Sequence, residues 1–174
     1  MGVGRWTNGT SSADEIMTSL ENKIALITGG RQGIGRAIVN LFAGQKATVI
    51  TCGRGPRPDD LPDTILWQTV DVSDAQAVNG LGDWVGAEVG RLDVLVNNAG
   101  IQIEKTILET TDDDWERLMG VNAKGVFLTC RAMIPLMTRE DGTGSIINIG
   151  SISGKVADPG LALYNCLLYT SDAA

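Results

Sequence analysis

The sequence contains no histidine, and this absence removes two common kinds of enzyme site. A Ser-His-Asp triad and a His-ligated metal centre both depend on an imidazole, so we expect no metal in this protein. The three cysteines are scattered and show no CxxC spacing. Isolated thiols of this kind are typical of a reducing compartment, and we predict a cytoplasmic location.

Positive charge and long apolar runs are also scarce. Lysine and arginine number 14 against 21 acidic residues, which gives a net charge of −7. Because nucleic-acid binding depends on clustered basic side chains, we expect no nucleic-acid partner. No apolar run approaches the ~18 residues that a membrane-spanning helix needs, and the N-terminus lacks the apolar core of a secretory signal. We therefore expect no membrane partner.

What the sequence does contain is a regular alternation of strand and helix patterns within 174 residues, enough for one domain. Short apolar runs predict buried strands at 23–28, 47–52, 65–70, 92–97 and 145–150. Helical patterns lie between most of them, which predicts an α/β fold with a parallel sheet. The proline-rich stretch after the second strand predicts a loop. Residues 1–21 are expected to form a flexible arm, and residues 22–165 the domain itself.

Helix boundaries are marked by capping patterns. Ser73 as N-cap with Gln76 three residues later predicts one helix start. Thr111, followed by three aspartates ending at Asp114, predicts another, because acids stabilise the positive end of a helix dipole. A longer helix is expected over 121–137, disturbed near Pro135.

A glycine-rich turn, from Thr28 to Gly35, joins the first strand to a helical pattern. Such turns bring backbone N–H groups and a helix N-terminus toward a bound pyrophosphate, with glycines allowing close approach. The spacing here is G-x-x-x-G-x-G. The alternative is a turn with a purely structural role.

The turn sequence TGGRQGIG resembles the glycine motif of the short-chain dehydrogenase/reductase family, and further motifs follow in the family's order. These are Asp71-Val72, Asn97-Asn98-Ala99-Gly100, Asn122 in VNAKGVF, Ser151 in INIGSISG, and Tyr164 at the usual distance from Ser151. The resemblance covers roughly residues 20–165. It implies a Rossmann-type, doubly wound parallel sheet in the strand order 3-2-1-4-5, without the final strands of the full family fold.

The resemblance also implies a set of cofactor-binding residues: Thr28, Gly29, Arg31, Gln32, Gly33, Ile34, Gly35, Arg54, Asp71, Val72, Asn98, Ala99 and Gly100. Asp71 would meet the adenine amino group, with Val72 beside the ring. Residues 98–100 would lie along the cofactor. The alternatives are that Asp71 only prepares the next helix and that residues 97–100 form an ordinary Asn-Gly turn.

The end of the second strand bears on the choice of cofactor. An acid at this point binds the ribose 2′-hydroxyl of NAD, whereas a basic residue accepts the 2′-phosphate of NADP. The sequence has Cys52-Gly53-Arg54, without an acid, so we favour NADP(H) over NAD(H). Arg31 and Arg57 are candidates to join Arg54. The alternative for these arginines is a solvated surface position.

By the same resemblance, three residues carry the chemistry. Tyr164 would exchange the proton, Ser151 would polarise the substrate oxygen, and Asn122 would organise a water relay. A tyrosine has an ordinary pKa of about 10 and needs a nearby cation to act near neutral pH. The alternatives are a strand-end serine, an ordinary helix asparagine and a partly buried aromatic.

The family pattern breaks at Leu168, where relatives carry the lysine that assists the tyrosine. The tail from Cys166 to Ala174 resembles the translation of a transposase-type sequencing adaptor, so we expect residues 166–174 to be non-native. This interpretation makes the chain an inactive, poorly soluble fragment of a larger protein, and the parent a homodimer or homotetramer. The alternative is an evolved loss of the lysine.

The sequence therefore predicts an NADP(H)-dependent oxidoreductase that interconverts a ketone and a secondary alcohol. The sequence motifs resemble those of 3-oxoacyl-acyl-carrier-protein reductases, but sugar, steroid and cyclic-alcohol dehydrogenases share the same motifs. Two alternatives remain open: an NAD-dependent dehydrogenase of the same family, and a non-catalytic module that senses NADP. A third alternative, a Rossmann-type methyltransferase, is disfavoured because it would not explain the ordered set Asn122, Ser151 and Tyr164.

Overall fold

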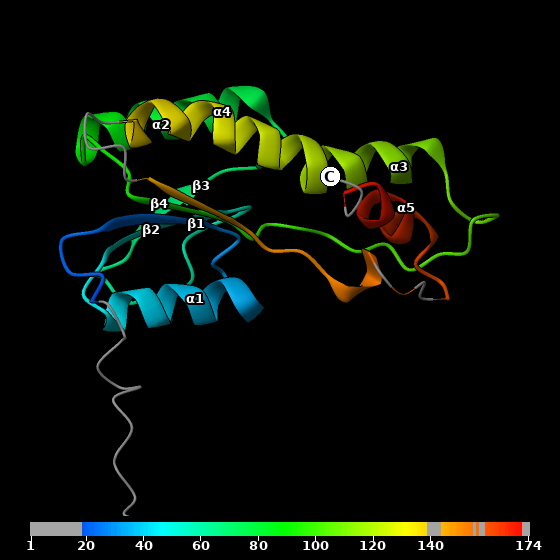
Figure 1. Ribbon diagram of the computed structural model, residues 1–174, viewed down its shortest axis with the longest axis horizontal. Helices are drawn as coiled ribbons and strands as arrows, with labels where there is room; N and C mark the ends of the chain where they lie inside the picture. The colour runs from blue at the N-terminus through cyan, green and yellow to red at the C-terminus, as the bar shows by residue number, and fades with distance from the viewer. Residues whose placement is uncertain (1–18, 139–143, 155, 157–158, 172–174) are drawn as a thin grey trace, which may run out of the picture.

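A five-stranded parallel sheet forms the centre of the computed structural model, which describes residues 19–138, 144–154, 156 and 159–171 (Figure 1). The strands are β1 (Ile24–Thr28), β2 (Thr48–Gly53), β3 (Leu66–Thr69), β4 (Val94–Asn97) and β5 (Ser145–Asn148). Their order is β3-β2-β1-β4-β5, and every pairing is parallel. The predicted strands and strand order are confirmed. Residues 1–18 of the expected arm and 172–174 of the expected tail lie outside the described residues.

Helices lie on both faces of the sheet (Figure 1). Helix α1 (Gly33–Gly44) packs on one face, while α2 (Ala75–Glu88) and α4 (Gly125–Met137) cover the other. Helices α3 (Asp112–Met119) and α5 (Ala162–Ser171) lie side by side near one end of the sheet. Right-handed crossovers between parallel strands produce this doubly wound arrangement.

The two faces of the sheet have separate hydrophobic cores. Leu26 and Leu95 pack toward α2 and α4, whereas the neighbouring Ala25 and Ile27 pack toward Val39 of α1. All five side chains are fully buried. Because successive strand residues point to opposite faces, a strand buried on both sides must be apolar throughout, as these runs are. Each buried aliphatic side chain contributes about 1.5–3 kcal/mol.

The two predicted capping patterns have different outcomes. Thr111 and Asp114 form a reciprocal capping box at the start of α3, as expected. The prediction of Ser73 as an N-cap is wrong. Helix α2 is capped by Asp74, whose side chain accepts hydrogen bonds from the N–H groups of Gln76 and Ala77. Ser73 instead donates its hydroxyl to Asp71, 2.7 Å away.

The predicted long helix is part of a longer continuous helical run. Helix α3 passes into a π-helical turn, Gly120–Lys124, and then into α4. Pro135 lies inside α4, which nevertheless extends to Met137. Inserted π turns are frequent at functional sites, and this one contains Asn122.

The loop predicted between the second and third strands is confirmed, since no helix lies between β2 and β3. On the other side of the sheet, β5 pairs with β4 and forms the edge of the described sheet. Its Ile146 and Ile147 are 41% and 42% exposed. Helix α5 continues through Cys166 to Ser171, so it includes part of the segment predicted to be non-native, which stays a prediction. No described helix is long and apolar enough to cross a membrane.

Candidate functional site

The N-terminus of α1 is open for an anion. Its N-cap residue, Gln32, makes no side-chain capping hydrogen bond, so backbone N–H groups of the first turn lack that partner. Gly33 adopts φ +58, and no described atom lies within 4 Å of the place a Cβ would occupy. A Cβ on Gly35 would instead overlap the carbonyl oxygen of Gly29 and the side-chain amide of Asn98. The turn thus combines close packing at Gly35 with a helix N-terminus that has no side-chain cap, which suits a phosphate.

A first cleft of about 430 Å³ opens over this turn. Twelve of the thirteen predicted cofactor-binding residues line it, namely Gly29, Arg31, Gln32, Gly33, Ile34, Gly35, Arg54, Asp71, Val72, Asn98, Ala99 and Gly100. The thirteenth, Thr28, lies beneath the cleft and is 2% exposed. The segments that bring them together are the ends of β1, β2, β3 and β4, at the carboxyl edge of the sheet where α/β proteins bind ligands.

Thr28 ties the first and fourth strands together. Its hydroxyl oxygen accepts hydrogen bonds from the N–H groups of Asn98 and Ala99, each at 3.0 Å, and donates to the carbonyl of Val96 at 3.4 Å. In return, the Asn98 side-chain amide donates to the carbonyl of Thr28 at 2.9 Å. These bonds fix the backbone of the cleft wall, so the Thr28 side chain acts from below the site.

Opposite charges face each other across the first cleft. Burial alone would raise the pKa of Asp71, but hydrogen bonds from the Ser73 hydroxyl and N–H, with the charge of Arg54, lower it below the ordinary value. Asp71 is therefore ionised at neutral pH, and the Arg54 side chain lines the same cleft. Nearby, burial raises the pKa of the Cys52 thiol to about 12, which makes that group unreactive.

The two further arginines proposed for this region have different positions. Arg31 lines the cleft and donates to the carbonyl of Pro56 at 2.8 Å, so it reaches across to the loop after β2. Arg57 lies outside the cleft lining. It donates to the carbonyls of Leu61, Pro62 and Ile65 at 2.7–2.9 Å and holds that loop together. A phosphate-binding role for Arg57 is not supported.

A second cleft of about 600 Å³ adjoins the first. The two share wall residues: Ile34, Asn98, Ala99, Gly100 and Ile101. A continuous groove therefore runs from the glycine turn to the three predicted catalytic residues, Asn122, Ser151 and Tyr164, which all line the second cleft. This juxtaposition joins segments more than a hundred residues apart.

The side chains of Asn122 and Ser151 differ in how strongly neighbouring groups hold them. The Asn122 side chain accepts from the N–H of Ile101 and donates to its carbonyl, both at 2.8 Å. This amide is engaged with the wall of the groove, and its expected water relay stays a prediction. Ser151 is exposed, and its hydroxyl lies 3.3 Å from that of Ser153. Its oxygen is accessible from the cleft.

Tyr164 lies on α5 and is half buried. It packs against a small core that includes Leu118, Leu163 and Ile103, so the helix is held against α3. Leu168, one helical turn further along, lines the same cleft. The position at which the family resemblance expects a lysine therefore faces the candidate reaction site.

Sequence reasoning missed a polar cluster below Ser151. Thr129 donates to Asn97 at 2.6 Å, and Asn97 donates to Asn148 at 2.9 Å. Asn97 and Asn148 are register partners on β4 and β5, so the cluster links helix α4 to the edge strand that ends just before Ser151. The lone asparagine within the apolar run SIINIG was the signal available.

An open parallel sheet with a glycine turn at an uncapped helix N-terminus, and a groove at its carboxyl edge, defines a dinucleotide-binding α/β protein. The sequence matches the family model described as short chain dehydrogenase over residues 23–166. The chain belongs to this family, whose members are oxidoreductases that bind NAD(P).

Individual relatives agree with this assignment. The chain is 35% identical to 3-oxoacyl-acyl-carrier-protein reductase FabG of Thermotoga maritima, a match that covers 83% of the chain and 62% of the relative. It is 37% identical to an NADP-dependent (R)-specific alcohol dehydrogenase of Lentilactobacillus kefiri, covering 84% and 61%. A crystal structure of a short-chain dehydrogenase from Streptomyces avermitilis superposes with a TM-score of 0.79 at 33% identity, covering 87% and 57%. The chain thus spans about three-fifths of the length of these curated relatives.

Proposed function

We propose that this chain carries the cofactor-binding and catalytic groups of an NADP(H)-dependent oxidoreductase that interconverts a ketone and a secondary alcohol. The observation that supports this most strongly is the continuous groove from the α1 N-terminus to Ser151 and Tyr164. The α1 amides would bind the bridging phosphates, and Arg54 the 2′-phosphate. Asp71 would accept a hydrogen bond from the adenine amino group.

In the reductive direction, a ketone, NADPH and a proton give an alcohol and NADP⁺. When bound, NADPH supplies a hydride to the carbonyl carbon. Ser151 would donate a hydrogen bond to the carbonyl oxygen, and Tyr164 would deliver the proton to that oxygen as charge develops on it. Asn122 would hold the Ile101 backbone in the wall between cofactor and substrate.

The cofactor preference can be tested at Arg54. A hydrogen bond between charged groups is worth about 1.5–3 kcal/mol, so Arg54→Gln is expected to weaken NADPH binding by roughly tenfold or more while leaving NADH binding unchanged. Titration calorimetry of both cofactors gives the two affinities. Arg131→Gln removes the same charge from an exposed site on α4 and is the control. Equal losses for NADPH and NADH in the Arg54 variant would contradict a 2′-phosphate contact.

The chemical role of Tyr164 can be tested at Leu168. Leucine cannot stabilise an ionised phenol, so we propose that the chain as written turns over slowly or not at all. Leu168→Lys places an ammonium one helical turn from Tyr164 and is expected to raise ketone-dependent NADPH oxidation by about 10²-fold or more. Leu168→Met keeps the length without the charge. If the methionine variant matched the lysine variant, the electrostatic role would be refuted.

If residues 166–174 belong to the native protein, the same leucine favours a second candidate function, a non-catalytic module that binds NADP. Leu168 and the adjacent buried Leu167 both line the second cleft, so the position one helical turn after Tyr164 is apolar and cannot stabilise an ionised phenol. Under this alternative, the Leu168→Lys variant would still bind NADPH and would show no turnover with any ketone.

A further inference from the structure

The second cleft differs from the first in its charge. Arg31, Arg54 and Asp71 line the first cleft. Among the described residues that line the second, none is charged. Its polar members are amides and hydroxyls, and the remainder are glycine, alanine and larger aliphatic side chains such as Ile101, Val126 and Ile149. An anion entering this cleft would lose water without meeting a cation.

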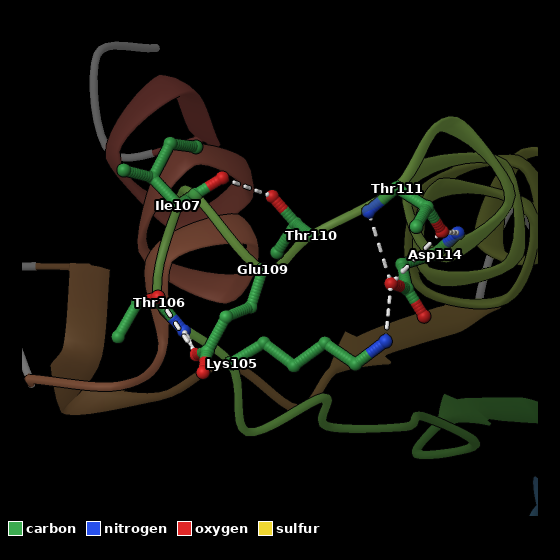
Figure 2. Close-up of polar contacts among 7 residues, drawn as sticks. All are labelled: Lys105, Thr106, Ile107, Glu109, Thr110, Thr111 and Asp114. Carbon is green, nitrogen blue, oxygen red and sulfur yellow. Dashed lines mark hydrogen bonds and ion pairs between the residues drawn. The ribbon is translucent and has the colours of Figure 1, made fainter.

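The segment that borders the cleft after Gln102 adds negative charge. Residues 101–117 contain six acidic residues and two basic ones. The Gln102 side chain donates to Glu104 at 3.4 Å, so an exposed carboxylate lies directly beside the wall. Glu109 accepts hydrogen bonds from the hydroxyl and N–H of Thr106, which lower its pKa and keep it ionised (Figure 2).

Lys105, the first of those two basic residues, is already paired. Its ammonium lies 2.6 Å from Asp114, and the same carboxylate oxygen accepts from the N–H and hydroxyl of Thr111 (Figure 2). The hydrogen bond from Lys105, followed by those from Thr111, lowers the pKa of Asp114, so this carboxylate stays ionised at neutral pH. This cation is bound to the α3 capping box instead of facing the groove.

We infer that, under the function proposed above, the substrate is an uncharged ketone or secondary alcohol with mainly apolar substituents. A carboxylate or phosphate close to the reacting carbon would be desolvated without a partner and repelled by Glu104 and its acidic neighbours. Selection against charged substrates therefore comes from the uncharged described wall and from the Glu104 carboxylate beside it, while the Lys105 ammonium is held by Asp114.

Methyl levulinate and levulinate form a matched probe pair, because they differ only by an ester in place of a carboxylate. The intact ¹⁵N-labelled chain, saturated with NADPH, whose reduced nicotinamide ring is uncharged, is titrated with each by NMR, which needs no turnover. The ester is expected to shift amide resonances of the second cleft and to bind at least tenfold more tightly than the carboxylate, about 1.4 kcal/mol. Equal or tighter binding of levulinate would overturn the inference, and so would absence of binding by both probes.

A charge variant sharpens the test. Gln102→Arg combined with Glu104→Gln places a cation on the wall and removes the nearest acid. This variant is expected to bring the two affinities within about threefold of each other. Leu41→Arg with Glu88→Gln makes the same change in net charge at exposed sites on α1 and α2, and should leave the tenfold preference intact. An unchanged preference in the cleft variant would refute the role assigned to wall charge.

The same titrations distinguish a failure of the proposed function from a failure of the substrate inference. If NADP⁺ produced no shifts in the first cleft, the proposed function would be wrong and the substrate inference would fall with it. If the cofactor bound there and, with NADPH in place, levulinate bound as well as its ester, only the inference would fail.

Discussion

Replacing Thr28 by valine tests the framework beneath the groove. The Thr28 hydroxyl is buried and accepts two backbone N–H groups while donating to a carbonyl. Valine keeps the shape but removes all three bonds. An unsatisfied buried donor costs about 1–3 kcal/mol, and the amides of Asn98 and Ala99 are only partly buried, so a total of about 2–3 kcal/mol is expected. A loss of this size is a large fraction of the stability of a small domain.

Urea unfolding followed by circular dichroism measures the change. With a slope of about 1–3 kcal/mol per molar urea, the midpoint should fall by roughly 1 M or more. Thr48→Val, an exposed position at the start of β2, is the matched control and should change the midpoint little. A Thr28 variant no less stable than the Thr48 variant would show that the amides of residues 98 and 99 do not depend on that hydroxyl.

Two further predictions concern the first cleft. Gly35→Ala should reduce NADPH affinity at least tenfold by calorimetry, because the new Cβ would displace Gly29 and Asn98; Gly44→Ala, in open space at the end of α1, is the control and should bind normally. Asp71 has a lowered pKa, so its charge stabilises the fold above about pH 4 and this contribution is lost as the pH falls through the folded-state pKa. The difference in unfolding free energy between wild type and Asp71→Asn should therefore shrink in acid, and a constant difference across the acid range would contradict this reasoning.

The sheet was predictable because its signal is local and physical. A strand buried on both faces must be apolar along most of its length, and the runs of β1, β2 and β4 meet that condition. The runs of β3 and β5, at the two edges of the described sheet, are less buried but still mainly apolar. The glycine turn was predictable for the same reason, since both Gly33 and Gly35 occupy positions where a side chain is excluded by conformation or by contact. Strand order came from the family resemblance, because no local pattern encodes it.

The side-chain partners were not predictable in this way. Ser73 and Asp74 both satisfy the preferences of an N-cap, and only the position of Asp71 decides between them, since it binds Ser73. Thr28 was expected to contact the cofactor, yet its hydroxyl oxygen accepts hydrogen bonds from backbone amides seventy and seventy-one residues away. Contacts at such separations depend on how strands meet, which residue type alone does not determine.

The two clefts share a short wall segment, residues 98–101, and hydrogen bonds hold this segment at both of its ends. The geometry of one cleft therefore depends on that of the other. At one end, the Thr28 hydroxyl accepts the N–H groups of Asn98 and Ala99; at the other, the Asn122 amide binds both backbone groups of Ile101. A displacement of this short segment would move the boundary of both clefts at once. It follows that Thr28→Val and Asn122→Ala should each weaken NADP⁺ and methyl levulinate binding together, whereas Arg54→Gln should weaken the cofactor alone.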